Sequence, residues 1–300
     1  MSKRIALRNL AFFPLAASVI LAAGGCMPVK PVRTAAVALT VQDVAAAASR
    51  QSNLLVVKEG TPAYIMLVDG LIEAYPNNKD LLIAGCQAYS SYASSFIPDD
   101  EPGKAEPLYR QAKEYGFRAL SSRADFSAAA SGNLDDFKTF LSRYRRKDVP
   151  ELFWTASAWA SWVACKPGDV NAMGDLPALE ALMRRILELD DSFYHGSPHL
   201  LMAVFLAAKP AVMGGDPARA KQHFERAFSL GGGRLLISRV YYAQYYLRAV
   251  GDRDLFRATL EEVLNTPADQ VPELTLANTI AREKARRLLD NMEVYFENTP

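Results

Sequence analysis

The fold of this 300-residue chain is most clearly indicated by the stretch Asp216-Pro-Ala-Arg-Ala-Lys-Gln-His-Phe-Glu-Arg-Ala-Phe-Ser-Leu230. An acidic residue followed directly by proline is typical of a helix start, because the carboxylate caps free amide groups and proline fits the first turn. Small or apolar side chains then recur at Ala220 and at the fourth, seventh and tenth residues after it, along one helix face. Glycines at 231–233 end the pattern. The segment therefore predicts an amphipathic helix that buries this face against other helices.

The same spacing returns along the chain. Besides Ala220, it begins at Tyr64, Ala105, Leu179 and Phe256, with shifts of 41, 74, 41 and 36 residues between successive windows. Such periods are close to those of helix-pair repeats, and the window at Ala220 resembles the second helix of a tetratricopeptide unit of about 34 residues. One helix pair cannot bury its apolar face alone, whereas stacked pairs can. We therefore predict an all-α protein, an α-solenoid of tetratricopeptide-like helix pairs; a non-repeating helical domain is the alternative.

Helical periods account for almost the whole chain after residue 40, and alternating strand patterns are absent. Groups of proline and glycine mark the breaks, since glycine allows positive φ and proline ends the preceding helix. The pattern predicts helices at 41–53, 62–75, 79–96, 104–121, 134–145, 150–165, 176–189, 198–208, 217–230, 234–250, 253–265 and 272–295.

The beginning of the chain has the three parts of a secretory signal peptide. Basic residues are followed by the apolar residues 10–21 and then by small residues up to Cys26. The apolar stretch is too short to span a membrane. The segment Leu21-Ala-Ala-Gly-Gly-Cys26 resembles a bacterial lipobox, although Ala23 occupies a position where leucine is most frequent.

The lipobox resemblance implies that Cys26 is acylated and becomes the first residue of the mature protein. Residues 1–25 are then the signal peptide, residues 26–39 an extended, lipidated tether, and residues 40–300 the helical-repeat domain. The mature chain is expected to face the periplasm from a bacterial membrane. Met27, where aspartate would retain an enteric lipoprotein at the inner membrane, favours the outer membrane.

Charge excludes one class of partner. The chain has 34 Lys and Arg residues against 33 acidic residues. Loss of Lys3, Arg4 and Arg8 with the signal peptide leaves a slight excess of acids. Nucleic-acid binding needs a basic stripe, so no nucleic acid is expected as a partner.

Neither a metal site nor a catalytic site is predicted, and no cofactor is expected. His195 and His199 are four residues apart, but Gly196-Ser-Pro198 between them marks a helix start and places His195 outside the helix. His223 is expected to be solvated. No phosphate-binding loop, nucleophile elbow or zinc-protease motif is present, so the protein is not predicted to be an enzyme.

Two cysteines remain beyond Cys26. Cys86 and Cys165 either form a disulfide, which an oxidising compartment permits, or are free thiols buried in the core. We favour free thiols, because both lie in the middle of alanine-rich helical segments.

Aromatic residues are the candidates for lining a ligand cleft, because they combine an apolar body with a polar edge. They stand among alanine and serine, which leave room beside a ring. The alternative for each is the core between repeats, and a mixed role is favoured for the group. Trp154 projects about 140° away from Trp159 on a helix, so these two are expected to divide the roles. The candidates are Trp154, Trp159, Trp162, Tyr89, Tyr92 and Phe96.

Four strings follow one another along the chain: Leu108-Tyr-Arg-Gln-Ala-Lys-Glu-Tyr-Gly116, Phe153-Trp-Thr-Ala-Ser-Ala-Trp159, His199-Leu-Leu-Met-Ala203 and Gly214-Gly-Asp-Pro-Ala-Arg-Ala-Lys-Gln-His-Phe224. None of them is a catalytic signature. In their order and spacing they resemble the T component of tripartite ATP-independent periplasmic (TRAP) transporters, the TatT family. The lipobox cysteine and the cryptic tetratricopeptide helices agree with this family.

The resemblance implies a periplasmic lipoprotein that partners a TRAP substrate-binding protein and helps pass a small hydrophobic or organic ligand toward the permease. It also implies a possible homo-oligomer with a pore or cleft through the helical body. The alternative function is a tetratricopeptide scaffold lipoprotein that organises envelope proteins without binding a small ligand.

We predict that Cys26→Ser abolishes acylation and releases a soluble or unprocessed protein. Each acyl CH₂ buried in the membrane contributes about 0.8 kcal/mol, so the several chains of a lipoprotein anchor it permanently. Labelling cells with a radioactive fatty acid measures the acylation of the parent protein and of the variant. An unlabelled parent protein would contradict the prediction.

Overall fold

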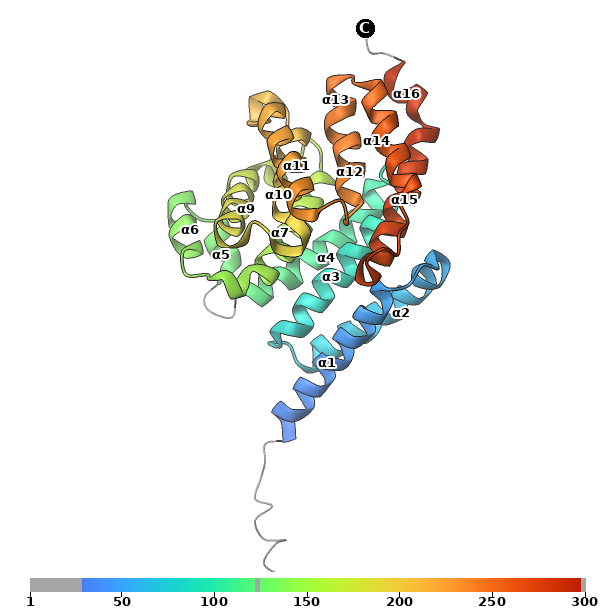
Figure 1. Ribbon diagram of the computed structural model, residues 1–300. Coiled ribbons are helices and arrows are strands. Elements are labelled where there is room, and N and C mark those ends of the chain that lie inside the picture. The colour runs from blue at the N-terminus through green and yellow to red at the C-terminus, as the bar shows by residue number, and fades with distance from the viewer. Residues whose placement is uncertain (1–28, 122–124, 298–300) are drawn as a thin grey trace, which may run out of the picture.

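The computed structural model describes residues 29–121 and 125–297 (Figure 1). Every regular element in these ranges is helical, as predicted. The long helices are α1 (Val29–Ser49), α2 (Leu54–Ala74), α3 (Lys79–Phe96), α4 (Pro102–Leu120), α7 (Val149–Ala164), α9 (Leu176–Asp190), α10 (Phe193–Ala208), α11 (Pro217–Gly231), α14 (Arg253–Asn265) and α15 (Thr275–Asp290). The short α-helices are α5 (Phe126–Ala130), α6 (Leu134–Leu141), α8 (Val170–Gly174), α12 (Ile237–Tyr241), α13 (Arg248–Val250) and α16 (Met292–Phe296). Single 3₁₀ turns are η1 (Arg146–Asp148), η2 (Ala211–Met213) and η4 (Pro272–Leu274), and η3 (Tyr242–Leu247) is a π-helix.

Helix ends follow the capping chemistry written in the sequence. The side chains of Asn78, Asp216 and Asp252 accept hydrogen bonds from backbone amides in the first turns of α3, α11 and α14. Gly232 and Gly251, with φ of 57° and 74°, end α11 and α13 in the left-handed conformation. The predicted bounds of these helices are therefore accurate to within a few residues.

The N-terminal segment differs from the prediction. Residues 29–39 were expected to be extended, yet α1 begins at Val29 and carries Thr40 in its interior. Pro31 lies in the first turn, where a missing amide costs no hydrogen bond, and no helix breaker follows before Ser49. The predicted signal peptide and Cys26 lie outside the described residues.

Three other boundaries also differ. Helix α2 begins at Leu54, because Asn53 caps it, and continues through Pro62, where a start was predicted. The helix expected at 134–145 ends at Leu141. The segment expected as one helix at 234–250 is divided into α12, η3 and α13. Pattern analysis cannot distinguish a π-helical turn from an α-helical one, because both carry apolar residues at similar intervals.

The face with the recurring spacing is largely buried, except in the first window, where Ala74 is exposed and Tyr64 and Leu71 are only partly buried. Phe224 has no exposed surface, and neither do Leu179, Phe256, Leu260 or Val263. Phe224 packs edge-on against Tyr242, with ring centroids 5.3 Å apart, which joins α11 to the C-terminal helices. The all-α solenoid is therefore confirmed, whereas its tetratricopeptide character stays a prediction.

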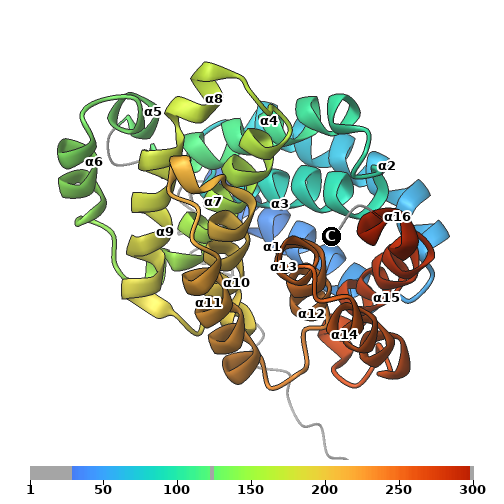
Figure 2. The ribbon, with the colours of Figure 1, turned by 90° about the horizontal axis from the view of Figure 1, so that it is seen from above.

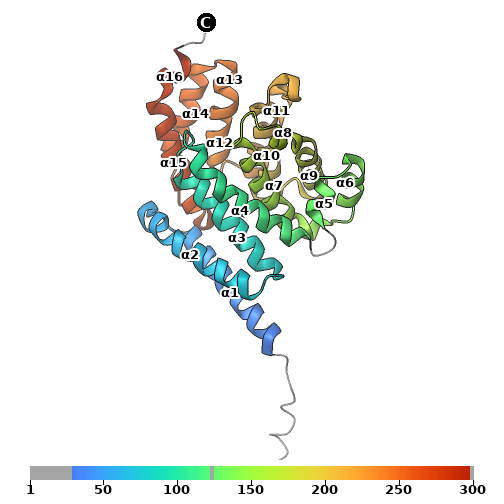
Figure 3. The same ribbon diagram turned by 180° about the vertical axis from the view of Figure 1, so that it is seen from behind.

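The row of helices curves until its ends meet. Successive helices pack against one another from α2 to α4 and from α7 to α11, and α14 packs on α15. Helix α15 and the η4 turn then contact α1, and α15 also contacts α2, so the last helices close against the first. Seen from above, the helices surround a central region (Figure 2). Figure 3 shows α3 and α4 side by side between α2 and α7 from behind. No helix within the described ranges is long and apolar enough to cross a bilayer.

Two glycines let the first half of this row pack closely. A Cβ on Gly85 of α3 would lie 2.7 Å from the Tyr115 ring of α4. A Cβ on Gly116 of α4 would lie 2.6 Å from the Thr155 hydroxyl of α7. Real Cβ atoms do not approach neighbours this closely, so α4 can contact both α3 and α7 only because these positions lack side chains.

We predict that Gly116→Ala destabilises the protein by about 1–3 kcal/mol, because Thr155 is fully buried and must move to admit the methyl group. Gly103→Ala is the matched control, since a Cβ at that position of α4 meets no atom within 4 Å. Urea unfolding followed by circular dichroism compares the two. Equal midpoints for both variants would contradict a packing role for Gly116.

Candidate functional site

The helices border a large, partly open cavity of about 1090 Å³. Small-molecule sites in proteins typically occupy roughly 300–1,000 Å³, so this space accommodates a sizeable organic ligand. Its walls come from both halves of the chain, including α2, α3, α4, α7, α10 and α15. The cavity therefore depends on the closure of the helical row.

Aromatic rings form much of the wall. Most come from helices that also carry small residues facing the same space, such as Ser91 and Ser94 of α3 and Ser157 and Ser161 of α7. These small residues leave volume beside the rings. The aromatic lining residues are Tyr64, Tyr92, Phe96, Tyr109, Phe153, Trp154, Tyr194, Phe205, Tyr241 and Tyr245.

The four tyrosines at the end of α12 and in the π-helix η3 point in pairs to two sides. Tyr241 and Tyr245 face the cavity, with ring centroids 5.6 Å apart. Tyr242 and Tyr246 stack on each other at 5.2 Å and pack beside α11 in the core. A π-helical turn thus supplies both a wall and a core contact.

The cavity tyrosines are protonated at neutral pH, as an ordinary tyrosine is, and burial raises their pKa values further. Burial, with a smaller contribution from the negative charge of Asp99, raises the pKa of Tyr241 to about 12. Burial also raises the pKa values of Tyr109 and Tyr245, with a smaller effect from neighbouring tyrosines. Within the described part of the chain, none of these three hydroxyls has a protein hydrogen-bond partner, so each can donate to a ligand.

The lysines of the wall are already paired. Lys209 Nζ lies 3.3 Å from Glu180 Oε2 and 3.9 Å from the centre of the Phe205 ring. Lys284 Nζ lies 3.3 Å from Asp99 Oδ1. Lys166 similarly pairs with an aspartate three residues later. The positive charge of each of these lysines is therefore compensated by a carboxylate.

The three tryptophans lie in different surroundings. Trp154 lines the cavity and packs edge-on against Tyr194, at 5.7 Å between ring centroids. Trp159 is outside the cavity wall, 1% exposed, and its Nε1 donates to Asp175 Oδ2 at 2.7 Å. Trp162 also lies outside the wall, where its Nε1 donates to Glu106 and Lys113 Nζ stands 3.6 Å above its ring.

The candidates on α3 divide in the same way. Tyr92 and Phe96 belong to the cavity wall. Tyr89 does not, because its hydroxyl donates to Asp69 Oδ2 at 2.7 Å. Tyr115 donates to the other oxygen of Asp69 at 2.8 Å, so this carboxylate ties α2 to both α3 and α4. Tyr89 is therefore part of a structural contact. Whether a ligand touches Tyr92, Phe96 and Trp154 stays a prediction.

The histidines form a pair that the sequence did not indicate. His195 lies outside regular helix, with φ of 61°, as predicted. His223, expected to be solvated, is half-buried, and its Nδ1 lies 2.8 Å from that of His199. Burial lowers the pKa of both rings. A positive charge on one ring also disfavours a positive charge on the other. No group of three or more potential ligand side chains in the described ranges is placed to hold a metal ion.

Both described cysteines are free thiols. Cys86 is buried and donates weakly to the Trp154 carbonyl at 3.5 Å. Burial raises its pKa to about 12 and that of Cys165 to about 11, so neither is a reactive thiolate at neutral pH.

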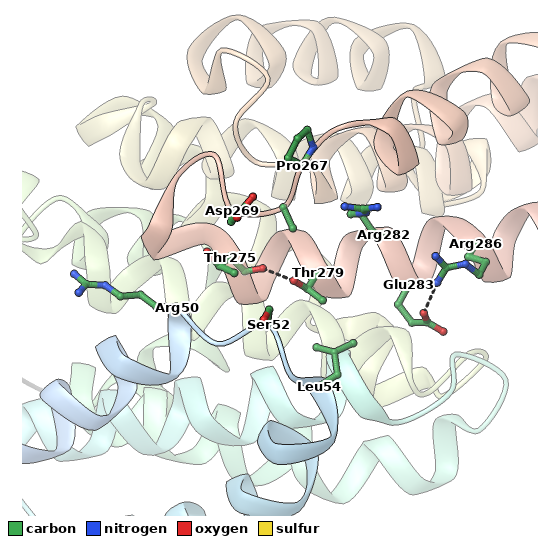
Figure 4. A pocket seen from close by; sticks show the side chains of 11 residues that line it. Arg50, Ser52, Leu54, Pro267, Asp269, Thr275, Thr279, Arg282, Glu283 and Arg286 are labelled. Atoms are coloured by element: carbon green, nitrogen blue, oxygen red, sulfur yellow. Dashed lines mark hydrogen bonds and ion pairs between the residues drawn. The ribbon is translucent and has the colours of Figure 1, made fainter.

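A second hollow of about 560 Å³ lies at the seam between the ends of the chain. Figure 4 shows Ser52, from the connection between α1 and α2, and Leu54, the first residue of α2, facing Thr279 of α15. Glu283 in its wall accepts a hydrogen bond from Arg286 at 2.8 Å. The lining is polar and charged, in contrast to the aromatic cavity, so it is the weaker candidate for a hydrophobic ligand.

Several wall residues escaped the pattern analysis. Tyr109 belongs to a recurring apolar face, which indicated the core. Tyr194 stands outside the predicted helices, and Phe153 resembles an ordinary core residue beside Trp154. Of these additional wall residues, only Tyr241 and Tyr245 could have been found from the sequence. They belong to a cluster of four tyrosines at 241–246, which is more than one core face needs.

We predict that Tyr89→Phe destabilises the protein by about 1 kcal/mol, since it removes a hydrogen bond to Asp69. Tyr92→Phe is the control, because no hydrogen bond of the Tyr92 hydroxyl is found in the described structure. Thermal unfolding should shift for the first variant alone. An unchanged midpoint for Tyr89→Phe would show that the contact contributes no net stability.

The comparison with known families agrees with this architecture. A family profile described as TRAP transporter T-component (TAtT) matches residues 50–296, which is most of the chain and includes every helix from α2 to α16. A search of curated proteins gave no match. The chain therefore belongs to the TRAP transporter T-component family.

Proposed function

We propose that this protein is a lipoprotein of a TRAP uptake system that binds the substrate-binding subunit and helps deliver a small hydrophobic or organic ligand. Family membership supports the association with a TRAP transporter. The proposal that the protein binds a ligand rests on one observation, the aromatic cavity of about 1090 Å³ between the helices. A solenoid that served only as a scaffold would not need such an interior space.

The cavity chemistry supports a largely uncharged ligand. Its lysines are paired with carboxylates, whereas the hydroxyls of Tyr109, Tyr241 and Tyr245 are unpaired donors. A ligand with an apolar body and at least one hydrogen-bond acceptor matches this arrangement. The rings bind the body, and a tyrosine hydroxyl orients the acceptor.

A non-enzymatic role is part of the proposal. The described cavity wall contains neither histidine nor cysteine, and its only carboxylate is Glu273. Acyl or group transfer usually needs a nucleophile and a base within hydrogen-bond reach. The wall offers contacts for binding but no such pair.

Anchoring at Cys26 places the protein at the periplasmic face of a membrane in this proposal. Helix α1 begins at Val29, three residues after the cysteine, so the anchor would sit at the end of α1 that projects from the helical body (Figure 1). Met27 supports the outer membrane as the location. A homo-oligomer remains part of the proposal.

A scaffold for envelope proteins is the second candidate, and the surface of α2 favours it. Leu55, Met66 and Leu67 are 62%, 74% and 54% exposed. Exposed apolar side chains on one helix are typical of protein-docking surfaces. The same surface also suits a substrate-binding subunit. Ligand binding in the cavity is therefore the property that distinguishes the two functions.

The test uses the full chain with Cys26→Ser in detergent-free buffer and the uncharged fluorescent probe N-phenyl-1-naphthylamine. We expect the probe to bind with increased fluorescence. Trp154→Ala should weaken binding about tenfold, equivalent to about 1.4 kcal/mol, because it removes an aromatic wall.

Trp159→Ala is the control for stability. It should cost about 3–5 kcal/mol of folding free energy, since Trp159 is fully buried. It leaves the cavity wall itself intact, so the fraction that remains folded should bind the probe as the parent does. Absence of probe binding by the parent would instead favour the scaffold function.

A further inference from the structure

The kinked start of α10 contains a costly backbone conformation. Tyr194, His195 and Gly196 follow one another with φ of 40°, 61° and 81°. Among the described residues, Tyr194 and His195 are the only non-glycine residues with positive φ. This conformation is rare for a residue as bulky as tyrosine, because its Cβ crowds the backbone.

Packing explains the backbone path at this turn. The Ser197 hydroxyl donates to the Tyr194 carbonyl at 2.6 Å, and the Gly196 amide donates to Ser192. A Cβ on Gly196 would lie 2.9 Å from Leu230 Cβ, so the turn is wedged against the end of α11. Glycine is therefore required at position 196 for two reasons: a Cβ would collide with Leu230, and the positive φ disfavours other residues.

Packing does not explain the side chain at position 194. A glycine or asparagine would adopt the same backbone with less strain. The Tyr194 ring is 40% exposed, so it buries only part of its surface. Its hydroxyl has no hydrogen-bond partner within the described structure. The ring thus contributes little to the core at a position where it carries a conformational cost.

The ring lies at the cavity. Tyr194 belongs to the cavity wall, and its centroid is 5.7 Å from that of Trp154 at an interplanar angle of 62°. Glu273 of η4 belongs to the same wall. Strained residues concentrate at functional sites, where the structure around them fixes an otherwise unfavourable side-chain position.

We propose that Tyr194 is a ligand-contacting residue and that the left-handed turn at 194–196 holds its ring beside Trp154 as one aromatic wall of the binding site. This inference rests on the proposed ligand-binding function. In this proposal the strained turn increases the affinity for the ligand and lowers the folding stability of the protein.

The experiment compares Tyr194→Gly with His195→Gly in the full chain carrying Cys26→Ser. Both substitutions place glycine at a positive φ, so both relieve strain, but only the first removes the cavity ring. We expect His195→Gly to raise the unfolding temperature and to leave the affinity for N-phenyl-1-naphthylamine unchanged. Tyr194→Gly should weaken the affinity at least tenfold without a comparable loss of unfolding temperature.

Tyr194→Phe and Tyr194→Asn complete the set. Phenylalanine keeps the ring and should bind within threefold of the parent, whereas asparagine tolerates the backbone without a ring and should bind as weakly as glycine. If Tyr194→Gly does not fold, Tyr194→Asn decides. Failure of both to fold would make the ring a core element and overturn the proposal.

The outcome for Trp154→Ala separates this inference from the proposed function. Weak binding by Trp154→Ala together with parental affinity in Tyr194→Gly would overturn the role of Tyr194 and leave the ligand-binding function intact. A parent protein that does not bind the probe would overturn both.

Discussion

The close approach of α4 to α3 and α7 is the constraint on which the rest of the structure depends. Gly85 and Gly116 have no room for even a methyl group, because Tyr115 and Thr155 occupy that space. Helices α3 and α7 are therefore held beside each other, and their serine-rich faces turn toward one interior space. A larger residue at either glycine would separate these helices and displace the rings that line the cavity.

Closure of the helical row makes this packed face one wall of a partly open interior cavity. A solenoid of stacked helices normally leaves its concave face open to solvent. Here α15 contacts α1 and α2, while Asp99 before α4 accepts hydrogen bonds from Gln244 at 3.1 Å and from Lys284 at 3.3 Å. These contacts join residues more than 140 positions apart in the chain. The interior space exists because both ends of the row are tied to each other.

Carboxylates decide which aromatic residues belong to the framework. Asp175, Glu106 and Asp69 accept hydrogen bonds from Trp159, Trp162 and Tyr89, and these three rings lie outside the cavity wall. In the wall, the hydroxyls of Tyr109, Tyr241 and Tyr245 have no hydrogen-bond partner within the described structure, whereas the Tyr64 hydroxyl donates to the Val41 carbonyl at 3.3 Å. A buried donor that already has a charged acceptor gains nothing from a ligand, whereas an unpaired donor does. The strained turn at Tyr194 follows the same division, because its ring serves the cavity at the expense of the backbone.

Sequence patterns alone predict the helical class, most helix bounds and the buried face of most repeat windows. These features depend on local rules, namely the 3.6-residue period, side-chain caps such as Asn78 and Asp216, and glycine at positive φ. The sequence also indicated that Trp154 and Trp159 point in different directions, since helix geometry alone fixes that angle. Only the tertiary structure decided which of them lines the cavity, because Asp175 reaches Trp159 from another segment. The pairing of His199 with His223, the π-helix at 242–247, the left-handed Tyr194 and the closure of the row likewise depend on contacts between distant segments, which no local pattern records.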